Sequence, residues 1–440
     1  MNRFTRKPTV YPISTAALLM LASFFNLQGE EPSWPQWRGE AQRGVASGSG
    51  FPIEWSESSN VLWKLKLPGT GGSTPVLAGK IAFLTFGADG NNNLAAIDTA
   101  EGKFIWKVSL GTDRGNKHRK GGGSNPSAVS DGQFVFAYFR SGDLACVNRD
   151  GQVIWQTNLQ DRYGEDTLWW DLGTSPLLTE NAIVVAVMQS GPSYLVAFDK
   201  QTGDELWRTD RITDAPKEAA QSYATPLNVR INGKSGIAVM GADHLTLHWA
   251  DSGEEIARLG GFNPRGEEFF RSIASPVAKG ELIVCPYSRG ETITTVNMTQ
   301  LAAGKGKDAI VWFRDDLGSD VPTPAAKDDK VYVVGDGKMN RGLVSCVDLE
   351  TGTAIWELQL PKSRHGFSSS PLITDNHLYV TQENATTFVI GPLDAEQPTL
   401  LATNSVADEE PFTVASPVPV ADSLLIRTPQ HLYRVSRQLE

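Results

Sequence analysis

Eight prolines, each preceded by a small polar residue, recur at nearly constant spacing, and this repeat constrains the fold more than any other feature. Successive prolines lie 51, 50, 50, 50, 48, 47 and 46 residues apart. A period of this length, with several short β-type runs inside each unit, is typical of a β-propeller with four strands per blade. The eight pairs are Thr74-Pro75, Asn125-Pro126, Ser175-Pro176, Thr225-Pro226, Ser275-Pro276, Thr323-Pro324, Ser370-Pro371 and Ser416-Pro417.

The unit around Pro176 shows the four predicted strands most clearly. A proline cannot donate to a strand ladder, so it is tolerated at the first residue of a strand or on a sheet edge. We therefore place each proline at the start of the innermost strand, beside a central channel. The β-rich runs of this unit are 174–178, 182–187, 194–198 and 205–208.

A hairpin with aspartate and glycine, followed by a tryptophan, joins the third and fourth runs of most units. The best copy runs from Asp199 through Gly203 to Trp207. Similar copies of the hairpin end at Trp106, Trp155 and Trp356. The aspartate can bond the turn backbone, and the glycine can adopt a positive φ. A tryptophan on the outer strand can pack against the next blade. We interpret these residues as scaffold.

The two ends of the repeat predict how the ring closes. After Pro417 the chain supplies only three β-rich runs, at 418–420, 424–426 and 431–435. The run 60–67 carries Trp63, the tryptophan of a fourth strand, without three strands before it. We therefore expect this run to complete the last blade and to remove its exposed edge. The predicted fold is an all-β, eight-bladed propeller of four-stranded antiparallel blades.

Three segments divide the chain. Residues 1–29 combine Arg3, Arg6 and Lys7 with an apolar run, which is the order of a secretory signal peptide. The alternative is a membrane anchor, but an apolar run of about a dozen residues is short for a bilayer. Residues 30–59 form an N-terminal extension, and 60–437 form the propeller. We expect a periplasmic or secreted protein with no transmembrane span after removal of the signal peptide.

Composition narrows the function classes further. The formal net charge of -10 disfavours nucleic acid and anionic membrane surfaces as partners. The three cysteines cannot form a disulfide framework, and we expect Cys146 and Cys346, at equivalent repeat positions, to be buried thiols. The six histidines are scattered over the chain, so no metal centre is predicted.

The tandem hairpins resemble the pyrroloquinoline-quinone-type repeat family of β-propellers. The resemblance is best at Phe198-Asp199 to Trp207 and at Val347-Asp348 to Trp356, and it spans roughly residues 60 to 437. The opening Trp34-Pro-Gln-Trp37-Arg-Gly39 also looks like the leader of exported bacterial members. The family includes quinoprotein dehydrogenases and the outer-membrane assembly propeller of the BamB type.

The two branches imply different chemistry. Many of the dehydrogenases hold the quinone between a tryptophan and a vicinal cysteine pair, beside a calcium ion and a catalytic aspartate. This chain has no adjacent cysteines and no Cys-x-x-Cys-His motif for a haem. The assembly propeller binds no cofactor. The resemblance therefore implies no cofactor here, and pyrroloquinoline quinone (PQQ) with calcium is the alternative.

The loops that enter the innermost strands surround the channel mouth, so they form the natural binding face of a propeller. They concentrate basic, aromatic and acidic residues, and the cluster 114–120 departs most from the acidic average of the chain. These side chains could bind an anionic planar ligand, a sugar or a peptide by stacking and charge-assisted hydrogen bonds, or they are only solvated loops. The candidates are Arg114, His118, Arg119, Lys120, Trp169, Trp170, Asp171, Tyr223, Arg271, Arg364 and His365.

Two functions compete at this point. The first is an exported, monomeric, non-catalytic propeller that binds a protein, peptide or glycan on its loop face. The second is a PQQ-dependent quinoprotein dehydrogenase that oxidises an alcohol or a sugar, for which Trp169 and Trp170 would lie near the channel. The absence of a vicinal cysteine pair favours the first function. No residue is assigned a catalytic role.

Overall fold

A computed structural model of the protein describes residues 1, 33–406 and 412–437. The chain divides into two units, Met1–Glu31 and Pro32–Glu440, and the account below concerns the described residues of the second unit. The predicted signal peptide lies outside the described residues.

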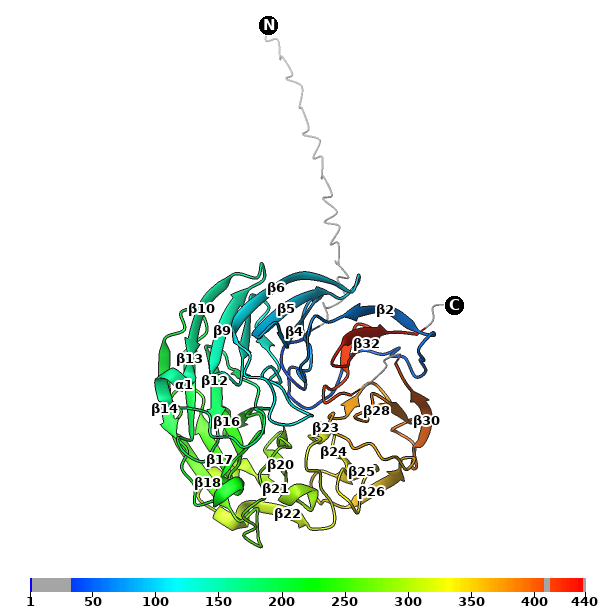
Figure 1. Ribbon diagram of the computed structural model, residues 1–440. Coiled ribbons are helices and arrows are strands. Elements are labelled where there is room, and N and C mark those ends of the chain that lie inside the picture. Colours follow the sequence, from blue (N-terminus) through cyan, green and yellow to red (C-terminus); the bar gives the residue numbers. More distant parts are fainter. Residues whose placement is uncertain (2–32, 407–411, 438–440) are drawn as a thin grey trace. The chain divides into compact units, whose positions relative to one another are not determined.

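Eight antiparallel sheets follow one another around a ring, as predicted (Figure 1). Each sheet is one blade; seven have four strands and the first has a fifth, and within a blade the chain runs from the innermost strand outward. The first four blades are β3 (Val76–Ala78), β4 (Ile81–Ala88), β5 (Asn91–Asp98) and β6 (Lys103–Thr112); β7 (Val129–Ser130), β8 (Phe134–Tyr138), β9 (Asp143–Asn148) and β10 (Val153–Asn158); β11 (Leu177–Leu178), β12 (Ala182–Val187), β13 (Tyr194–Asp199) and β14 (Glu205–Asp210); and β15 (Leu227–Ile231), β16 (Lys234–Gly241), β17 (His244–Trp249) and β18 (Glu255–Gly260).

The other four blades repeat this order, and the last of them borrows its outer strand from the N-terminal part of the chain. A further short strand, β1 (Ser33–Trp34), joins the inner edge of the first blade. The remaining strands are β19 (Val277–Lys279), β20 (Leu282–Tyr287), β21 (Thr292–Asn297) and β22 (Ile310–Arg314); β23 (Ala325–Lys327), β24 (Lys330–Val334), β25 (Leu343–Asp348) and β26 (Ala354–Gln359); β27 (Leu372–Ile373), β28 (Leu378–Thr381), β29 (Thr387–Gly391) and β30 (Thr399–Asn404); and β31 (Val418–Val420), β32 (Ser423–Arg427), β33 (His431–Val435) and β2 (Val61–Lys66).

Helices are few and short in the described part of the chain. Within that part, no helix is long and apolar enough to span a membrane. The helical segments are α1 (Leu159–Tyr163), α2 (Met298–Ala302), η1 (Lys217–Ala220), η2 (Ser288–Gly290) and η3 (Gly306–Ala309).

Burial along each blade follows the hydrophobic pattern. The middle strands are buried on both faces, as in β12, whose sequence is AIVVAV. The outer strand β6 alternates between exposed and partly buried residues over most of its length. This is the pattern expected when both faces of a sheet pack on neighbouring blades and only the outer strand meets water. The repeat therefore buries one apolar layer between each two neighbouring blades.

The N-terminal strand closes the ring as predicted. Strand β2 pairs with β33, and Trp63 lies opposite Arg434 in that ladder. Figure 1 shows this blue strand beside the red strands of the last blade. The pairing removes the free edge that the three C-terminal strands would otherwise expose.

The small hydroxyl residues of the proline signals form a closed circle of hydrogen bonds. In each blade the backbone N–H of this residue donates to the hydroxyl of its counterpart in the next blade, at 2.8 to 3.0 Å. In the second blade the position is Ser127, two residues after the Asn125 that the spacing selected. We call these residues the hydroxyl ring: Thr74, Ser127, Ser175, Thr225, Ser275, Thr323, Ser370 and Ser416.

One substitution tests the hydroxyl ring. Thr225→Val keeps the shape of a side chain that is 4% exposed but removes the acceptor of the Ser175 N–H. A buried donor without a partner costs about 1–3 kcal/mol, so urea unfolding should show a loss of that size. Thr112→Val, at an exposed position of β6, is the control and should change little. Equal stability of the two variants would contradict a structural role for the ring.

The outer-strand tryptophans pack on the next blade, as predicted. The Nε1 of Trp63 donates to the carbonyl of Thr99 at 2.9 Å, and Trp312 does the same to Leu349. A β-carbon on Gly102, which has a φ of +66°, would lie 2.4 Å from the Trp63 ring. This contact explains why the hairpin needs glycine.

Residues 33–46 bind the inner strands of several blades, and we call this segment the plug. Arg38 donates to the carbonyls of Pro371 and Pro324, while the amide of Gln42 donates to Pro226. The plug thus binds the fourth, sixth and seventh blades. Burial without an acidic partner lowers the pKa of Arg38, whose side chain is 3% exposed.

The cysteines occupy the apolar layers. Cys146 on β9 and Cys346 on β25 are buried and unpaired, as predicted for small hydrophobic residues. Burial raises the pKa of the Cys346 thiol to about 11, so this thiol stays protonated and unreactive at neutral pH.

Candidate functional site

A cavity of about 520 Å³ lies on the channel axis above the hydroxyl ring. Seven of the eight ring residues line it, Thr323 being the exception, and the plug contributes Trp37. Exposed side chains such as Arg119 and the partly exposed Trp170 also line it, so the cavity opens to solvent at the mouth. The channel is therefore a pocket with one open end.

The structure brings together seven of the eleven predicted site residues. Those that line the cavity are His118, Arg119, Lys120, Trp170, Asp171, Tyr223 and Arg271. The other four do not line it, although their loops belong to the mouth. They are Arg114, which donates to Gln160, Trp169, which packs on Phe269, and the neighbours Arg364 and His365.

Asp171 anchors the basic loop that follows β6. Its carboxylate accepts the backbone N–H groups of Lys117 and His118 at 2.8 to 3.0 Å, and Arg140 lies 3.2 Å away. Lys117 itself turns inward, with Nζ 3.0 Å from Asp166. Part of the basic cluster therefore holds the loop in place and is not available to a ligand.

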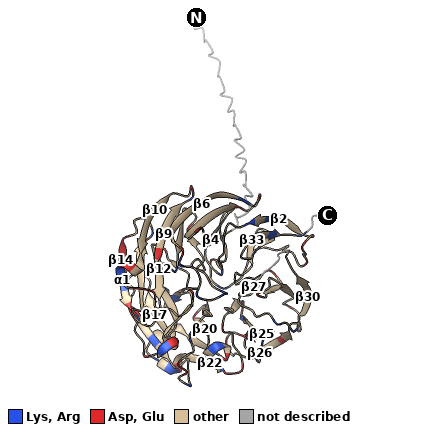
Figure 2. Ribbon diagram, in the orientation of Figure 1, with Lys and Arg blue, Asp and Glu red and all other residues tan. Residues whose placement is uncertain are grey.

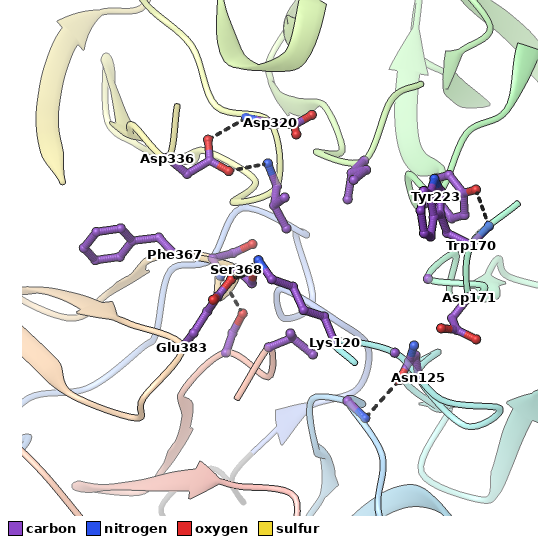
Figure 3. Close-up of a pocket in the computed structure, with 18 of the residues that line it drawn as sticks. Lys120, Asn125, Trp170, Asp171, Tyr223, Asp320, Asp336, Phe367, Ser368 and Glu383 are labelled. Carbon is purple, nitrogen blue, oxygen red and sulfur yellow. Dashed lines mark hydrogen bonds and ion pairs between the residues drawn. The ribbon is translucent and has the colours of Figure 1, made fainter. Parts of the chain in front are cut away.

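Lys120 reaches across the mouth to the seventh blade. Its Nζ forms an ion pair with Glu383, and the hydroxyl of Ser368 donates to the same carboxylate oxygen at 2.6 Å (Figure 3). The Glu383 side chain is only 8% exposed, whereas that of Lys120 is 35% exposed. The ion pair joins two loops that lie 263 residues apart in the sequence.

Glu218, on η1, fixes the other side of the mouth. Its carboxylate accepts Nε1 of Trp170 at 2.8 Å and a guanidinium nitrogen of Arg289 at 3.2 Å, and it is buried. Arg271 lies 3.7 Å from the same carboxylate and 3.3 Å from Asp320. One buried acid thus sets the position of an exposed aromatic ring and of two arginines.

Three exposed aromatic side chains stand beside the cavity, and we call them the aromatic platform. Trp169, Trp170 and Phe269 are 47%, 40% and 50% exposed. The rings of Trp169 and Phe269 lie 6.2 Å apart, and His118 meets Trp170 edge-on at 5.5 Å. Exposed apolar side chains that gather in one patch are a feature of interaction surfaces.

Asp336 is an acid of the cavity lining that sequence reasoning did not select. It accepts the backbone N–H groups of Asp320 and Val321 at 2.7 and 3.0 Å (Figure 3). Burial, together with the nearby charge of Asp320, raises the pKa of Asp336 to about 7. This carboxyl therefore changes its charge near neutral pH.

The raised pKa predicts a pH dependence of stability. An unfolded aspartate has a pKa of about 4, so between about pH 4 and 7 the folded chain holds a proton that the unfolded chain releases. Stability contributed by Asp336 is therefore lost as the pH rises through this window. We expect Asp336→Asn to flatten the decline in unfolding free energy, measured by urea titration across the window. An unchanged slope would contradict the assignment.

The carboxylates that line the cavity already have partners within the protein. The carboxylates are already bonded: Glu383 to Lys120, Asp171 to backbone N–H groups and Asp336 likewise. Among the described residues, no three acidic, histidine or cysteine side chains converge as metal ligands.

The proline signals identified only one of the two loops that each blade sends to the mouth. The other loop joins the second and third strands, and it supplies Arg140, Asp336, Arg341 and Glu383. The sequence carries a signal for this second loop. It is a polar residue among turn-forming residues between two β-rich runs, as in Gly335-Asp-Gly337. Trp37 was recognised in the sequence only as part of the leader motif, and not as a site residue.

The family comparison agrees with the repeat. The sequence profile described as PQQ_2, outer membrane protein assembly factor BamB, matches residues 43–221 and 278–418. No curated protein matches the chain.

Solved structures share the fold at low sequence identity. BamB from Moraxella catarrhalis is 13% identical, with a TM-score of 0.60 over 85% of this chain and 99% of that chain. A europium-containing methanol dehydrogenase is 10% identical, with a TM-score of 0.68 over 93% and 99%. The quinohemoprotein alcohol dehydrogenase from Comamonas testosteroni is 12% identical, with a TM-score of 0.66 over 93% and 82%. At such identities the likeness establishes the fold alone.

Proposed function

The chain belongs to the family of outer membrane protein assembly factor BamB, and from that premise we propose that it is an exported, non-catalytic propeller that binds a protein partner at its channel mouth. The family name concerns an assembly factor, and propellers of this scaffold also serve as enzymes. The choice between a binding protein and an enzyme therefore depends on the residues of the mouth.

The aromatic platform is the observation that favours protein binding. Tryptophan and arginine are the residues most enriched at binding hot spots, and a ring that is already fixed loses little entropy on binding. Trp170 is held by Glu218, and Trp169 packs on Phe269. The platform combines exposure with rigidity, as an interface anchor requires.

The bonding of Glu383 and Asp171 argues against a catalytic role for these two acids. A general acid or base must be free to exchange a proton with substrate, and a metal-assisted oxidation needs convergent oxygen ligands. Glu383 and Asp171 are engaged by Lys120 and by Arg140 with backbone N–H groups. These acids hold the loops of the mouth together, which is what a binding surface needs.

A titration separates this function from the quinoprotein alternative. The purified protein is titrated with PQQ, with and without calcium, and tryptophan fluorescence reports binding. We expect no stoichiometric complex and no oxidation of alcohols or sugars. A one-to-one complex that requires calcium, is weakened by Trp170→Ala and turns over an alcohol would establish the dehydrogenase instead.

A further inference from the structure

The charges of the mouth are not equally available to a ligand. The four acids that line the cavity all have partners: Glu383 with Lys120, Asp320 with Arg271, and Asp171 and Asp336 with backbone N–H groups. Lys120, Arg271 and Arg140 compensate the charges of Glu383, Asp320 and Asp171 in that order. Burial and the charge of Asp320 raise the pKa of Asp336 to about 7, so Asp336 carries only part of a negative charge at neutral pH.

Several cations of the same mouth have no such compensation. Arg119 and Arg341 line the cavity and are exposed, and neither forms an ion pair with any carboxylate in the described part of the chain. The exposed residues Lys338, Lys362 and Arg364 on the loops of the sixth blade share this property. The chain as a whole has a net charge of -10, and both signs occur around the ring (Figure 2).

The two arginines lie on loops from different parts of the ring. Arg119 belongs to the loop between β6 and β7, whereas Arg341 belongs to the loop between β24 and β25. Both reach one cavity, whose 520 Å³ accommodates a few side chains and no folded domain. Guanidinium groups bind carboxylates with two parallel hydrogen bonds, so each of these arginines suits an acidic group.

We propose that the mouth binds an extended peptide segment of a partner, with an acidic side chain in the cavity and an apolar side chain on the aromatic platform. The proposal rests on the proposed function, because it names the kind of segment that the same site takes. Arg119 and Arg341 bind the carboxylate, and Trp169 and Trp170 contact its apolar neighbour. Lys120 stays paired with Glu383 and contributes little charge.

A peptide selection tests the charge directly. Random dodecapeptides displayed on phage are selected against the immobilised full chain and then measured as free peptides by fluorescence anisotropy. We expect the selected sequences to be enriched in an aspartate or glutamate near an aromatic or aliphatic residue. Arg119→Gln combined with Arg341→Gln should weaken their binding roughly tenfold to a hundredfold. Arg149→Gln, an exposed hairpin residue away from the mouth, should leave it unchanged.

The outcomes distinguish this inference from the proposed function. Both arginines are exposed and unpaired among the described residues, so the double variant should keep the thermal midpoint of the wild type. Selected peptides without an acidic residue, whose binding is still lost in a Trp169→Ala/Trp170→Ala variant, would overturn the acidic segment and leave the platform in place. Failure to select any peptide would overturn the peptide segment, whereas the proposed function is tested separately by cross-linking at Trp169.

Discussion

Arg38→Ala is expected to lower the free energy of unfolding by about 3–5 kcal/mol, the cost typical of emptying a large buried site. The guanidinium binds the carbonyls of Pro371 and Pro324, which lie in two neighbouring blades. The alanine leaves both carbonyls without this donor and opens a space beneath the cavity. Urea denaturation of the full chain measures the loss.

Two further variants make this result specific. Arg38→Met fills most of the volume but supplies no donor, so its loss should fall to about 1–3 kcal/mol. Arg149→Ala, at an exposed position, should change stability by no more than about 0.5 kcal/mol. If Arg38→Ala were as harmless as Arg149→Ala, the plug would not help to hold the ring together.

The second large effect is expected at the ion pair across the mouth. Lys120→Met removes the cation beside Glu383, whose side chain is 8% exposed. The carboxylate then keeps the hydrogen bond from the Ser368 hydroxyl. Breaking a buried ion pair from one side costs about 3–5 kcal/mol, and the 35% exposure of Lys120 reduces our expectation to about 2–3 kcal/mol.

A double-mutant cycle isolates this interaction. Glu383→Gln removes the buried charge, so Lys120→Met combined with Glu383→Gln should be more stable than Lys120→Met alone. Urea unfolding of the wild type, both single variants and the double variant gives the coupling energy. Strictly additive losses would mean that the two side chains stabilise the mouth independently, contrary to the structure.

The fold could be predicted because its signals are local and repeated. Each proline marks the start of an inner strand, and five hairpin glycines accommodate the tryptophan of the preceding blade, as Gly102 does for Trp63. Where the signal fades, the contact changes too. Trp356 faces the seventh blade, whose hairpin lacks the Asp-x-x-x-Gly spacing of the best copies, and its Nε1 has no hydrogen-bond partner among the described residues.

The plug and half of the mouth could not be predicted because their contacts are distant in sequence. The hydrogen bond from Arg38 to Pro371 spans 333 residues, and the contact from Lys120 to Glu383 spans 263. No local pattern indicates which carbonyl or carboxylate such a side chain will meet. The basic cluster could be recognised in the sequence. Only the structure shows that Lys117 pairs with Asp166 and that Lys120 pairs with Glu383.

Site-specific photo-cross-linking in cells tests most directly whether the channel mouth binds a protein partner. A benzoylphenylalanine replaces Trp169 on the aromatic platform or, as control, Leu206, which is 50% exposed on the outer strand β14. We predict that irradiation joins the chain to one protein, identified by mass spectrometry, at position 169 and not at 206. No adduct at position 169, or the same adducts at both positions, would contradict a binding site at the mouth.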